Sequence, residues 1–411
     1  MQDIELYQQI LGLAEPWSVQ SVELNIDEGR VDIHVEHPAG VKWKCPHCER
    51  KLSCYDHSAE RTWRHLDTCQ LSTHLHARIP RVQCEEHGVV QVAVPWAEEH
   101  GRFTLLMERM IIQALLACQT TKGACELMRI SWDQAWHVTQ RAVARGQVRK
   151  EAVVITQIGV DEKAFRKGHS YMTVVNDINR GTVEFITEDR EKASLERYYA
   201  TLSDEQRSGI TGVAMDMWEP YLQATLEALP LAKEKIVFDR FHIMQHMTKG
   251  VDQVRKGEHR QLTSEGDERL KKTKYLWLTR EKNLSEQQEE SFEELKSSAL
   301  KTARAWGIKE NLANLWSYKS PGWAKRFFGQ WYQWAIRSRL EPVKKVAKMI
   351  QRRLENVITY CRHFITNAVA EGLNSKIMSI KRRAGGFRNP ENFKTAIYFH
   401  CGGLSLYPKC R

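Results

Sequence analysis

Three short apolar segments, each ending in an aspartate, constrain the fold of this chain more than any other feature. Between the first two lie a pair of strand-like segments joined by the turn Asn179-Arg180-Gly181, and then an amphipathic helix. A further helix begins near Pro220, before the last apolar segment. The predicted order is therefore β-β-β-α-β-α-β, with strands at residues 153–161, 171–178, 182–186, 210–216 and 235–239.

This order is the ribonuclease H-like topology, in which the first and fourth strands are neighbours in the sheet. Asp161 and Asp216, at the ends of those two strands, should then lie side by side. Asp239 ends the last strand. The pattern predicts an α/β domain with acids gathered at one sheet edge.

A third acid, Glu371, occurs much later in a segment with helical spacing. Asn367, Glu371, Asn374 and Ser375 share one helical face, so Glu371 would project among small polar groups. A solvated helix residue is the alternative. If it joins Asp161 and Asp216, three carboxylates suit two Mg²⁺ ions, or Mn²⁺ in their place, and such ions serve phosphodiester chemistry. Asn374 is a supporting candidate, and the cations that follow are suited to neutralising phosphates: Lys376, Lys381, Arg382 and Arg383.

Two short cysteine-containing turns in the N-terminal part have the spacing of zinc knuckles. Cys45-Pro-His-Cys48 and Cys84-Glu-Glu-His87 each supply two ligands, and Gly88 allows a tight turn after the second pair. Alternating residues around Asp27-Glu28-Gly29 predict a β-hairpin before them, and residues 71–79 predict a strand between them. We expect one structural Zn²⁺ in a small β-rich module.

Residues 105–145 contain three segments with helical periodicity. Ser131 and Gln134 have the spacing of a capping box at the start of the third helix. A short helix, a tight turn and a second helix form a helix-turn-helix pattern, although a plain helical linker would have the same periodicity. With Ala135, Val138 and Ala142 facing inward, the predicted DNA-facing residues are His137, Gln140, Arg141 and Arg145.

The long interval before Glu371, residues 243–360, lacks strand-like alternation and predicts an all-helical insertion. Its second part, residues 300–355, carries thirteen Lys and Arg against three acids. Aromatic side chains among cations suit nucleic acid, but Trp at helical spacing is more often core. The tryptophans concerned are Trp306, Trp316, Trp323, Trp331 and Trp334.

Composition places the chain among soluble, multidomain proteins with a polyanionic partner. The 411 residues exceed one core, and the net charge of +10 favours phosphate binding, although it can also serve solubility alone. Ten cysteines in such a length do not form a disulfide scaffold. No apolar run reaches a membrane span and the N-terminus lacks a signal sequence, so a cytoplasmic location without membrane contact is expected.

We therefore expect a multidomain α+β protein in which a ribonuclease H-like α/β catalytic domain is interrupted by an all-α insertion. The expected parts are a β-rich zinc-binding module (1–100), a helix-turn-helix segment (101–150), the first part of the catalytic core (151–242), the helical insertion (243–360), and a final core helix with Glu371 and a basic C-terminal segment (361–411).

Over essentially its full length the sequence resembles the ISL3 family of bacterial insertion-sequence transposases. The resemblance rests on Cys45-Pro-His-Cys48 with Arg81-Val-Gln-Cys84, Gly159-Val-Asp161, Met215-Asp216-Met, Phe238-Asp239-Arg-Phe-His242, Glu371-Gly-Leu-Asn374-Ser-Lys376 and Lys381-Arg-Arg-Ala-Gly-Gly-Phe387. It implies a DDE triad of Asp161, Asp216 and Glu371. It also implies zinc ligands at Cys45, Cys48 and Cys84, with His87 where relatives commonly have Cys. Asp239-x-x-His242 resembles a motif shared more widely among such transposases, which implies a place behind the site or close to the scissile strand.

The resemblance further implies a bacterial, nucleoid-associated enzyme that binds the terminal inverted repeats of its element and joins them to target DNA. Water would attack the phosphodiester at the element end, and the freed 3′-hydroxyl would attack target DNA. Because two ends must be paired, a homodimer or higher oligomer is expected. The rival functions are a non-catalytic DNA-binding regulator with the same zinc and helical modules, and a metal-dependent nuclease that cuts without joining.

Overall fold

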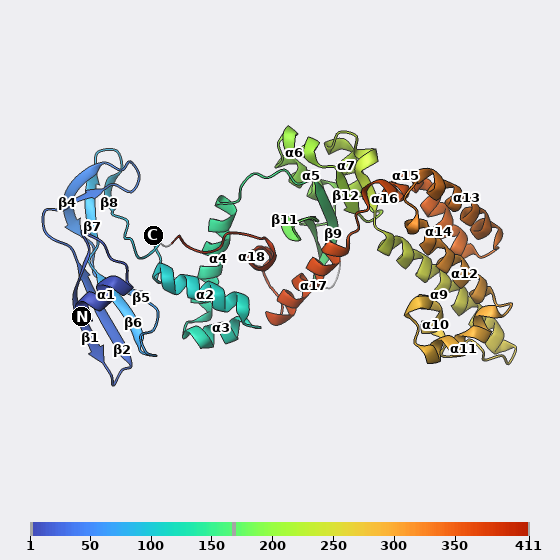
Figure 1. Ribbon diagram of the computed structural model, residues 1–411, viewed down its shortest axis with the longest axis horizontal. Coiled ribbons are helices and arrows are strands. Elements are labelled where there is room, and N and C mark those ends of the chain that lie inside the picture. The colour runs from blue at the N-terminus through green and yellow to red at the C-terminus, as the bar shows by residue number, and fades with distance from the viewer. Residues whose placement is uncertain (1–2, 167–169, 410–411) are drawn as a thin grey trace. The chain divides into compact units, whose positions relative to one another are not determined.

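The computed structural model describes residues 3–166 and 170–409, which form two compact units (Figure 1). One unit consists of Met1–Glu151 with Ile380–Arg411, and the other of Ala152–Ser379. The chain thus returns to its first unit at the C-terminal end. Within the predicted final part, residues 361–411, helix α18 (Pro390–Cys401) packs on helix α4 (Trp132–Val148) in the first unit.

The N-terminal module begins with α1 (Asp3–Ile10) and contains two four-stranded sheets. The first has the order β1 (Ser18–Asn25), β2 (Arg30–Glu36), β6 (Ser72–Ala77), β5 (Arg61–Arg64), and the second the order β3 (Lys42–Lys44), β4 (Lys51–His57), β7 (Pro80–Cys84), β8 (Gly88–Gln91). Val31, Ile33 and Val35 alternate with polar residues and are buried. The predicted hairpin is confirmed, with Gly29 in its turn at φ +62°.

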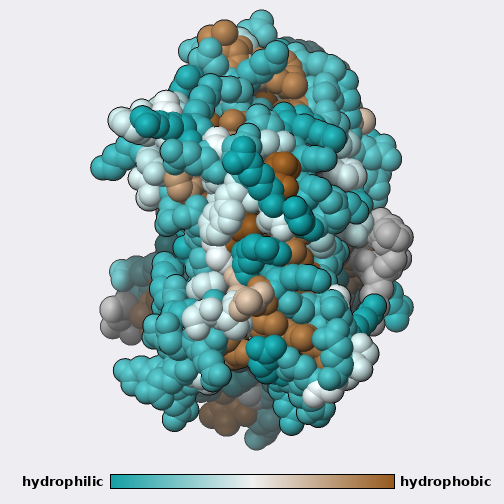
Figure 2. All heavy atoms as spheres, turned by 90° about the vertical axis from the view of Figure 1, so that its right-hand side faces the viewer, coloured by the Kyte–Doolittle hydropathy of each residue, from teal (hydrophilic) through white to brown (hydrophobic). Residues whose placement is uncertain are grey.

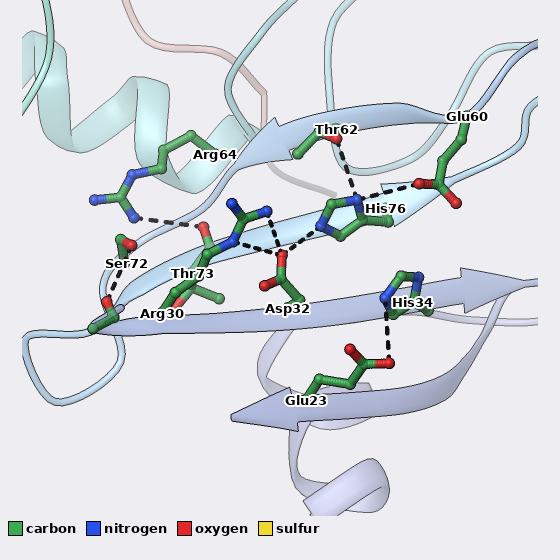
Figure 3. A network of polar contacts seen from close by, with 11 residues as sticks. Glu23, Arg30, Asp32, His34, Glu60, Thr62, Arg64, Ser72, Thr73 and His76 are labelled. Atoms are coloured by element: carbon green, nitrogen blue, oxygen red, sulfur yellow. Dashed lines mark hydrogen bonds and ion pairs between the residues drawn. The ribbon is translucent and has the colours of Figure 1, made fainter. Parts of the chain in front are cut away.

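Polar side chains cross the first sheet from strand to strand (Figure 3). His76 lies between two acids, with its Nε2 2.6 Å from Asp32 Oδ1 and its Nδ1 3.6 Å from Glu60 Oε1. Arg30 Nη2 donates to the same Asp32 oxygen at 2.7 Å. Burial opposes ionisation of Asp32, yet the hydrogen bonds from Arg30 and His76 prevail and lower its pKa. The network joins β2, β5 and β6.

Three helices follow, α2 (Leu105–Ala117), α3 (Thr121–Met128) and α4, at almost the predicted positions. The capping box of Ser131 and Gln134 is present at the start of α4. Ala135, Val138 and Ala142 are buried in a cluster to which Phe399 and Leu406 of the C-terminal segment also belong. The helix-turn-helix segment therefore shares its core with the end of the chain.

The second unit is built on a five-stranded sheet of order β11 (Thr182–Glu188), β10 (Ser170–Asp177), β9 (Gln157–Arg166), β12 (Gly212–Met215), β13 (Ile236–Phe238). The first and fourth strands, β9 and β12, are neighbours as predicted, and they pair in parallel. Strand β9 begins later than expected and continues beyond Asp161, because this residue pairs with Val174 of β10. Asp161 therefore lies within its strand.

The helices between strands are α5 (Lys192–Ala200), α6 (Asp204–Gly209), α7 (Glu219–Ala228) and α8 (Ala232–Lys235).

Residues 243–360 contain no strand, as predicted, and every one of them is described. Buried side chains at Trp306, Trp316 and Trp331 belong to its core, whereas Trp323 and Trp334 are exposed. The face in Figure 2 is mainly hydrophilic, with hydrophobic side chains exposed in small groups. Two short 3₁₀ turns (Glu281–Asn283, Ala313–Ser317) accompany α9 (Arg240–Ser264), α10 (Lys274–Leu278), α11 (Glu286–Ser297), α12 (Lys301–Leu312), α13 (Pro321–Arg337), α14 (Glu341–Arg352), α15 (Leu354–Ile358) and α16 (Tyr360–His363).

Helix α17 (Ala368–Arg383) then returns to the sheet and runs beside β9 (Figure 1). In the described part of the chain, no helix is both long and apolar enough to cross a membrane.

Candidate active site and metal centres

The parallel pairing of β9 with β12 sets the spacing of the first two acids. Gly159 is the partner of Ala214, so Asp161 and Asp216 follow at equivalent positions on neighbouring strands. Each is half-buried and accepts a hydrogen bond from the next backbone N–H, that of Glu162 at 2.8 Å and that of Met217 at 2.6 Å. The adjacency predicted from the strand order is present.

Helix α17 brings the third acid to the same edge. Asn374 donates a hydrogen bond from Nδ2 to Asp161 Oδ2, and Glu371 lies one helical turn earlier. Glu371 is exposed, while Asn367 at the helix start is 1% exposed. Residues separated by more than two hundred positions in the sequence thus meet at one sheet edge.

Close packing of α17 on the sheet requires a glycine two residues before Asp161. A Cβ on Gly159 would lie 2.7 Å from Oδ1 of both Asn176 and Asn367, far inside van der Waals contact. The two buried amides therefore occupy the space over Gly159. Reasoning from the sequence missed Asn176, and the glycine before the aspartate was the available signal for such an approach.

Asp239 completes the acidic cluster. Its backbone N–H donates to Met215 O at 2.9 Å. Asp239 therefore lies directly after β13 and beside Asp216. Its Oδ1 accepts from Phe241 N–H at 3.1 Å and caps α9, whereas its buried Oδ2 has no hydrogen-bond partner among the described residues. His242, one turn into α9, places Nδ1 3.6 Å from Asp216 Oδ2.

The carboxylates repel one another and are partly removed from water. Burial raises the pKa of Asp161 and Asp239, and for Asp239 the charges of Asp161 and Asp216 raise it further. The pKa of Glu371 is raised by burial and then by Asp239. His242 acts in the opposite direction on all three acids. The site therefore carries an excess of negative charge.

These residues suit a hard divalent cation. All the donors are carboxylate oxygens, which Mg²⁺ and Mn²⁺ prefer, and Asp239 Oδ2 is a buried acceptor without a protein donor. No three acids in the described ranges bring their oxygens within 4.8 Å of one another.

Four other ligands come together in the N-terminal module. The ligand atoms of Cys45, Cys48, Cys84 and His87 all lie within 4.8 Å of one another. Cys48 Sγ and Cys84 Sγ are 3.6 Å apart, and His87 Nδ1 is 3.4 Å from Cys84 Sγ and 3.9 Å from Cys45 Sγ. Ligands of tetrahedral Zn²⁺ are separated by roughly 3.5–4 Å. This is the predicted zinc site.

The chemistry of the thiols agrees with a closed structural site. The hydrogen bond with His87 lowers the pKa of Cys84 to about 6, which favours the thiolate that binds metal. Cys45 and Cys84 are buried, and Gly88 after the second pair has φ +68°. Because all four positions are filled by protein ligands, the site supports the fold and leaves no position for a substrate.

Helix α4 presents only part of the predicted DNA-facing set. His137 and Gln140 are exposed. The prediction that Arg141 and Arg145 point outward is wrong: both pair with the buried Glu108 of α2. Arg145, whose side chain is 7% exposed, also donates to Glu98 at 2.6 Å. Periodicity gave the helix face correctly, but the long arginine side chains reach back to acids from earlier segments.

The basic residues after Glu371 all lie on α17. Lys376 is exposed, and Lys381, Arg382 and Arg383 form the last turn of the helix, where cations stabilise the negative end of the helix dipole. Arg382 and Arg383 are exposed, and Lys381 is half-buried.

Comparison with known proteins assigns each part of the chain. A family model of ISL3-type DDE transposases, described as "Transposase", matches residues 158–397. A second, described as the zinc-finger of transposase IS204/IS1001/IS1096/IS1165, matches residues 42–87, and a third, described as the helix-turn-helix domain of transposase family ISL3, matches residues 92–143. The zinc and helix-turn-helix modules predicted from the sequence are thereby confirmed.

Whole-length relatives agree with these matches. The transposase for insertion sequence element IS1557 of Mycobacterium tuberculosis H37Rv is 28% identical, and the similarity covers 95% of this chain and 94% of that protein. The transposase for insertion sequence element IS1001 of Bordetella parapertussis is 27% identical, with 93% and 95% covered. Since the first family model alone covers more than half of its length, this chain belongs to the ISL3 family of insertion-sequence DDE transposases.

Proposed function

We propose that this protein binds the terminal inverted repeats of its element, cuts the DNA at the element ends and joins the freed ends to target DNA. The observation that carries the proposal is the convergence of Asp161, Asp216 and Glu371 at one sheet edge, with Asn374 holding the first of them. Joining requires both ends together, so the active form is a homodimer or a higher oligomer.

Each carboxylate has a defined part in the proposed reaction. Asp161, Asp216 and Glu371 would hold two Mg²⁺ ions, for which Mn²⁺ can substitute. When bound, the ions supply activation of the attacking oxygen and stabilisation of the leaving oxygen. Asn374 fixes the orientation of Asp161 through its hydrogen bond. Asp239 and His242 support Asp216 from β13 and α9.

Recognition of the element ends is proposed for the first unit. The zinc module would position α4, whose exposed His137 and Gln140 would contact base edges in the major groove. On α17, Lys376 in the second unit and Lys381, Arg382 and Arg383 in the first would neutralise phosphates. Arg141 and Arg145 instead fix the helix from behind through Glu108.

The proposal is tested by incubating the protein with paired element ends, a target plasmid and Mg²⁺. The ends are taken from the inverted repeats that flank the coding sequence. Wild type should give nicked and joined products, and Asp161→Asn should lose both by about a hundredfold or more while still binding the ends. Asp252→Asn is the matched control, because the ion pairs of Asp252 among the described residues are with Arg255 and Lys256 of α9, away from the acids.

The products distinguish the proposed function from its rivals. Cleavage without joining would identify a metal-dependent nuclease. Binding of the ends with neither product would identify a DNA-binding regulator.

A further inference from the structure

The two strands that lead to the first two acids are not paired as far as the acids themselves. The last paired residues of β9 and β12 are Gly159 and Ala214. Asp161 and Asp216 therefore lie two residues beyond the parallel pairing, where ladder hydrogen bonds no longer join the two strands. The separation of their carboxylates depends on contacts made by the residues that follow them.

Arg190, which follows β11, makes such a contact with the first strand. Its Nη1 lies 3.2 Å from both carboxylate oxygens of Glu162, the residue after Asp161. The backbone N–H of Glu162 donates to Asp161 Oδ1 at 2.8 Å. Because successive side chains of a strand point to opposite faces, this ion pair lies on the face away from the Asp161 carboxylate. Arg190 thus holds the backbone beside the acid and does not reach the acid itself.

Trp218, two residues after Asp216, joins the same arginine to the second strand. Its Nε1 donates to Arg190 O at 2.9 Å, and the guanidinium carbon of Arg190 lies 4.8 Å from the centroid of its indole ring. The ring of Tyr171 on β10 is also close, with its centroid 4.3 Å from that carbon. One ion pair and two aromatic contacts leave the planar guanidinium little freedom to move.

The backbone before Arg190 is itself anchored to the sheet. Asp189 has φ +66°, a left-handed conformation that few residues other than glycine adopt. Its N–H donates to Tyr171 O at 2.9 Å, and its carbonyl accepts from Thr173 Oγ1 at 2.7 Å. Arg190 therefore extends from a fixed point on β10.

The surroundings of Arg190 are poorly suited to a phosphate. The arginine lines a cavity of about 570 Å³ whose wall carries three acids and two cations: Asp189, Glu191, Glu219, Arg190 and Lys192. Lys192 is already paired with Glu227 at 2.6 Å, as Arg190 is with Glu162. An excess of negative charge repels a phosphate, so the charge of Arg190 serves the protein itself.

We infer that Arg190 is a positioning residue, which ties Glu162 to Trp218 and thereby sets the separation of the Asp161 and Asp216 carboxylates for divalent cations. It acts through the chain neighbours of the two acids, from the opposite face of the sheet. This inference rests on the proposed function, because it takes these two acids as metal ligands.

Binding of Mn²⁺ to the full chain, followed by electron paramagnetic resonance, tests this role without relying on catalysis. Arg190→Met keeps much of the side-chain length and removes the charge and the planar group. It should weaken Mn²⁺ binding by about tenfold, as is usual when a residue that orients metal ligands is changed. Arg190→Lys keeps a charge near Glu162 and should recover part of the loss. Asp161→Asn should lose the same Mn²⁺, which assigns the signal to this site.

The direction of the change separates positioning from two other roles. If Arg190 acted only through its positive charge, its removal would strengthen the binding of a cation at the acids. If it served only the stability of the fold, Arg190→Met would lower the melting temperature and leave the Mn²⁺ affinity of the folded protein unchanged. Either result would overturn the inference. Arg197→Met is the matched control, because this exposed arginine of the same unit donates to Thr187 Oγ1 at 3.1 Å, and it should leave the Mn²⁺ affinity unchanged.

A second variant covers the case in which Arg190→Met does not fold. Trp218→Phe keeps an aromatic ring and removes the hydrogen bond to Arg190 O, so it should also weaken Mn²⁺ binding, and an unchanged affinity would overturn the inference. In cleavage of element ends, the half-saturating Mg²⁺ concentration should rise about tenfold with Arg190→Met.

The two readouts distinguish failure of the inference from failure of the proposed function. If wild type binds Mn²⁺ through Asp161 but cleaves no DNA, the proposed function fails and the Mn²⁺ titrations alone decide the inference. If wild type cleaves DNA but Asp161→Asn loses no Mn²⁺, the inference fails and the proposed function stands.

Discussion

At the scale of single residues, burial is the main cause of the shifted pKa values of the acids at the site. Asp161 and Asp239 have raised pKa values because their carboxylates are partly withdrawn from water and have few donors. A bound cation would offset this cost, so metal binding should weaken as pH falls and the acids take up protons. The same physics acts on a buried histidine in the other unit.

His65 should make the first unit sensitive to acid. It is 3% exposed, its Nδ1 lies 2.8 Å from Thr104 Oγ1, and burial lowers its pKa from 6.5 to about 4. Between these values the unfolded chain binds the proton and the folded chain does not. The free energy of unfolding should therefore fall as pH drops from about 6.5 to 4, by about 3 kcal/mol at most from this residue.

Denaturant unfolding at several pH values checks this expectation. His65→Gln retains a polar partner for Thr104 and removes the titration, so its stability should depend less on pH in that window. His137→Gln, at an exposed residue, should keep the wild-type dependence. Identical pH dependence for wild type and His65→Gln would count against a buried neutral histidine.

At the scale of elements, α4 divides its polar residues between two tasks. On its inner flank, Arg141 and Arg145 form ion pairs with Glu108 of α2. Glu108 is 1% exposed, and burial raises the pKa of its carboxyl. Its outer face carries His137 and Gln140, which in the described part of the chain pair with no acid. Substitutions on the two sides should therefore have different consequences.

Variants of α4 should separate stability from recognition. Arg145→Ala leaves Glu108 with one partner fewer and should lower the free energy of unfolding by on the order of 3 kcal/mol. The double substitution His137→Ala with Gln140→Ala should leave stability unchanged and weaken binding to the element end relative to unrelated DNA by about tenfold. Chemical denaturation and competition binding measure the two effects. A loss of sequence preference with Arg145→Ala at full stability would contradict this division.

The zinc knuckles make a separate prediction for the N-terminal module. Purified protein should contain about one zinc per chain, and Cys45→Ser should lose the metal and with it the order of this module. Cys69→Ser is the control, because Cys69 is exposed and outside the four-ligand cluster. Metal analysis and circular dichroism provide the readouts. Equal zinc content in the two variants would exclude Cys45 as a ligand.

At the scale of the whole molecule, the chain builds two units from segments that are distant in sequence. Local patterns predicted the hairpin at Gly29, the three helices before Glu151 and the β9–β12 pairing, because each depends on periodicity or strand order. They did not predict that Phe399 and Leu406 pack with Val138, since an apolar side chain does not reveal its partner. The ion pair between Arg145 and Glu98 was not predicted for the same reason.

The acids were predictable for a different reason. Asp161 and Asp216 occur at equivalent places on strands whose order the topology fixes, and Glu371 is set apart by its polar helical face. Asn176 was not predicted, although it is the β10 partner of Gly159, because the exact register of β9 on β10 is not visible in the sequence.

The central claim is that Glu371, beyond the helical insertion, forms one active site with Asp161 and Asp216. Single-turnover cleavage of an element end in Mg²⁺ tests it most directly, with Glu371→Gln compared with Glu286→Gln at an exposed position in the first turn of α11. The account predicts that Glu371→Gln binds the DNA and melts like wild type but cleaves about a hundredfold or more slowly, while Glu286→Gln cleaves normally. Cleavage by Glu371→Gln at the wild-type rate would contradict it.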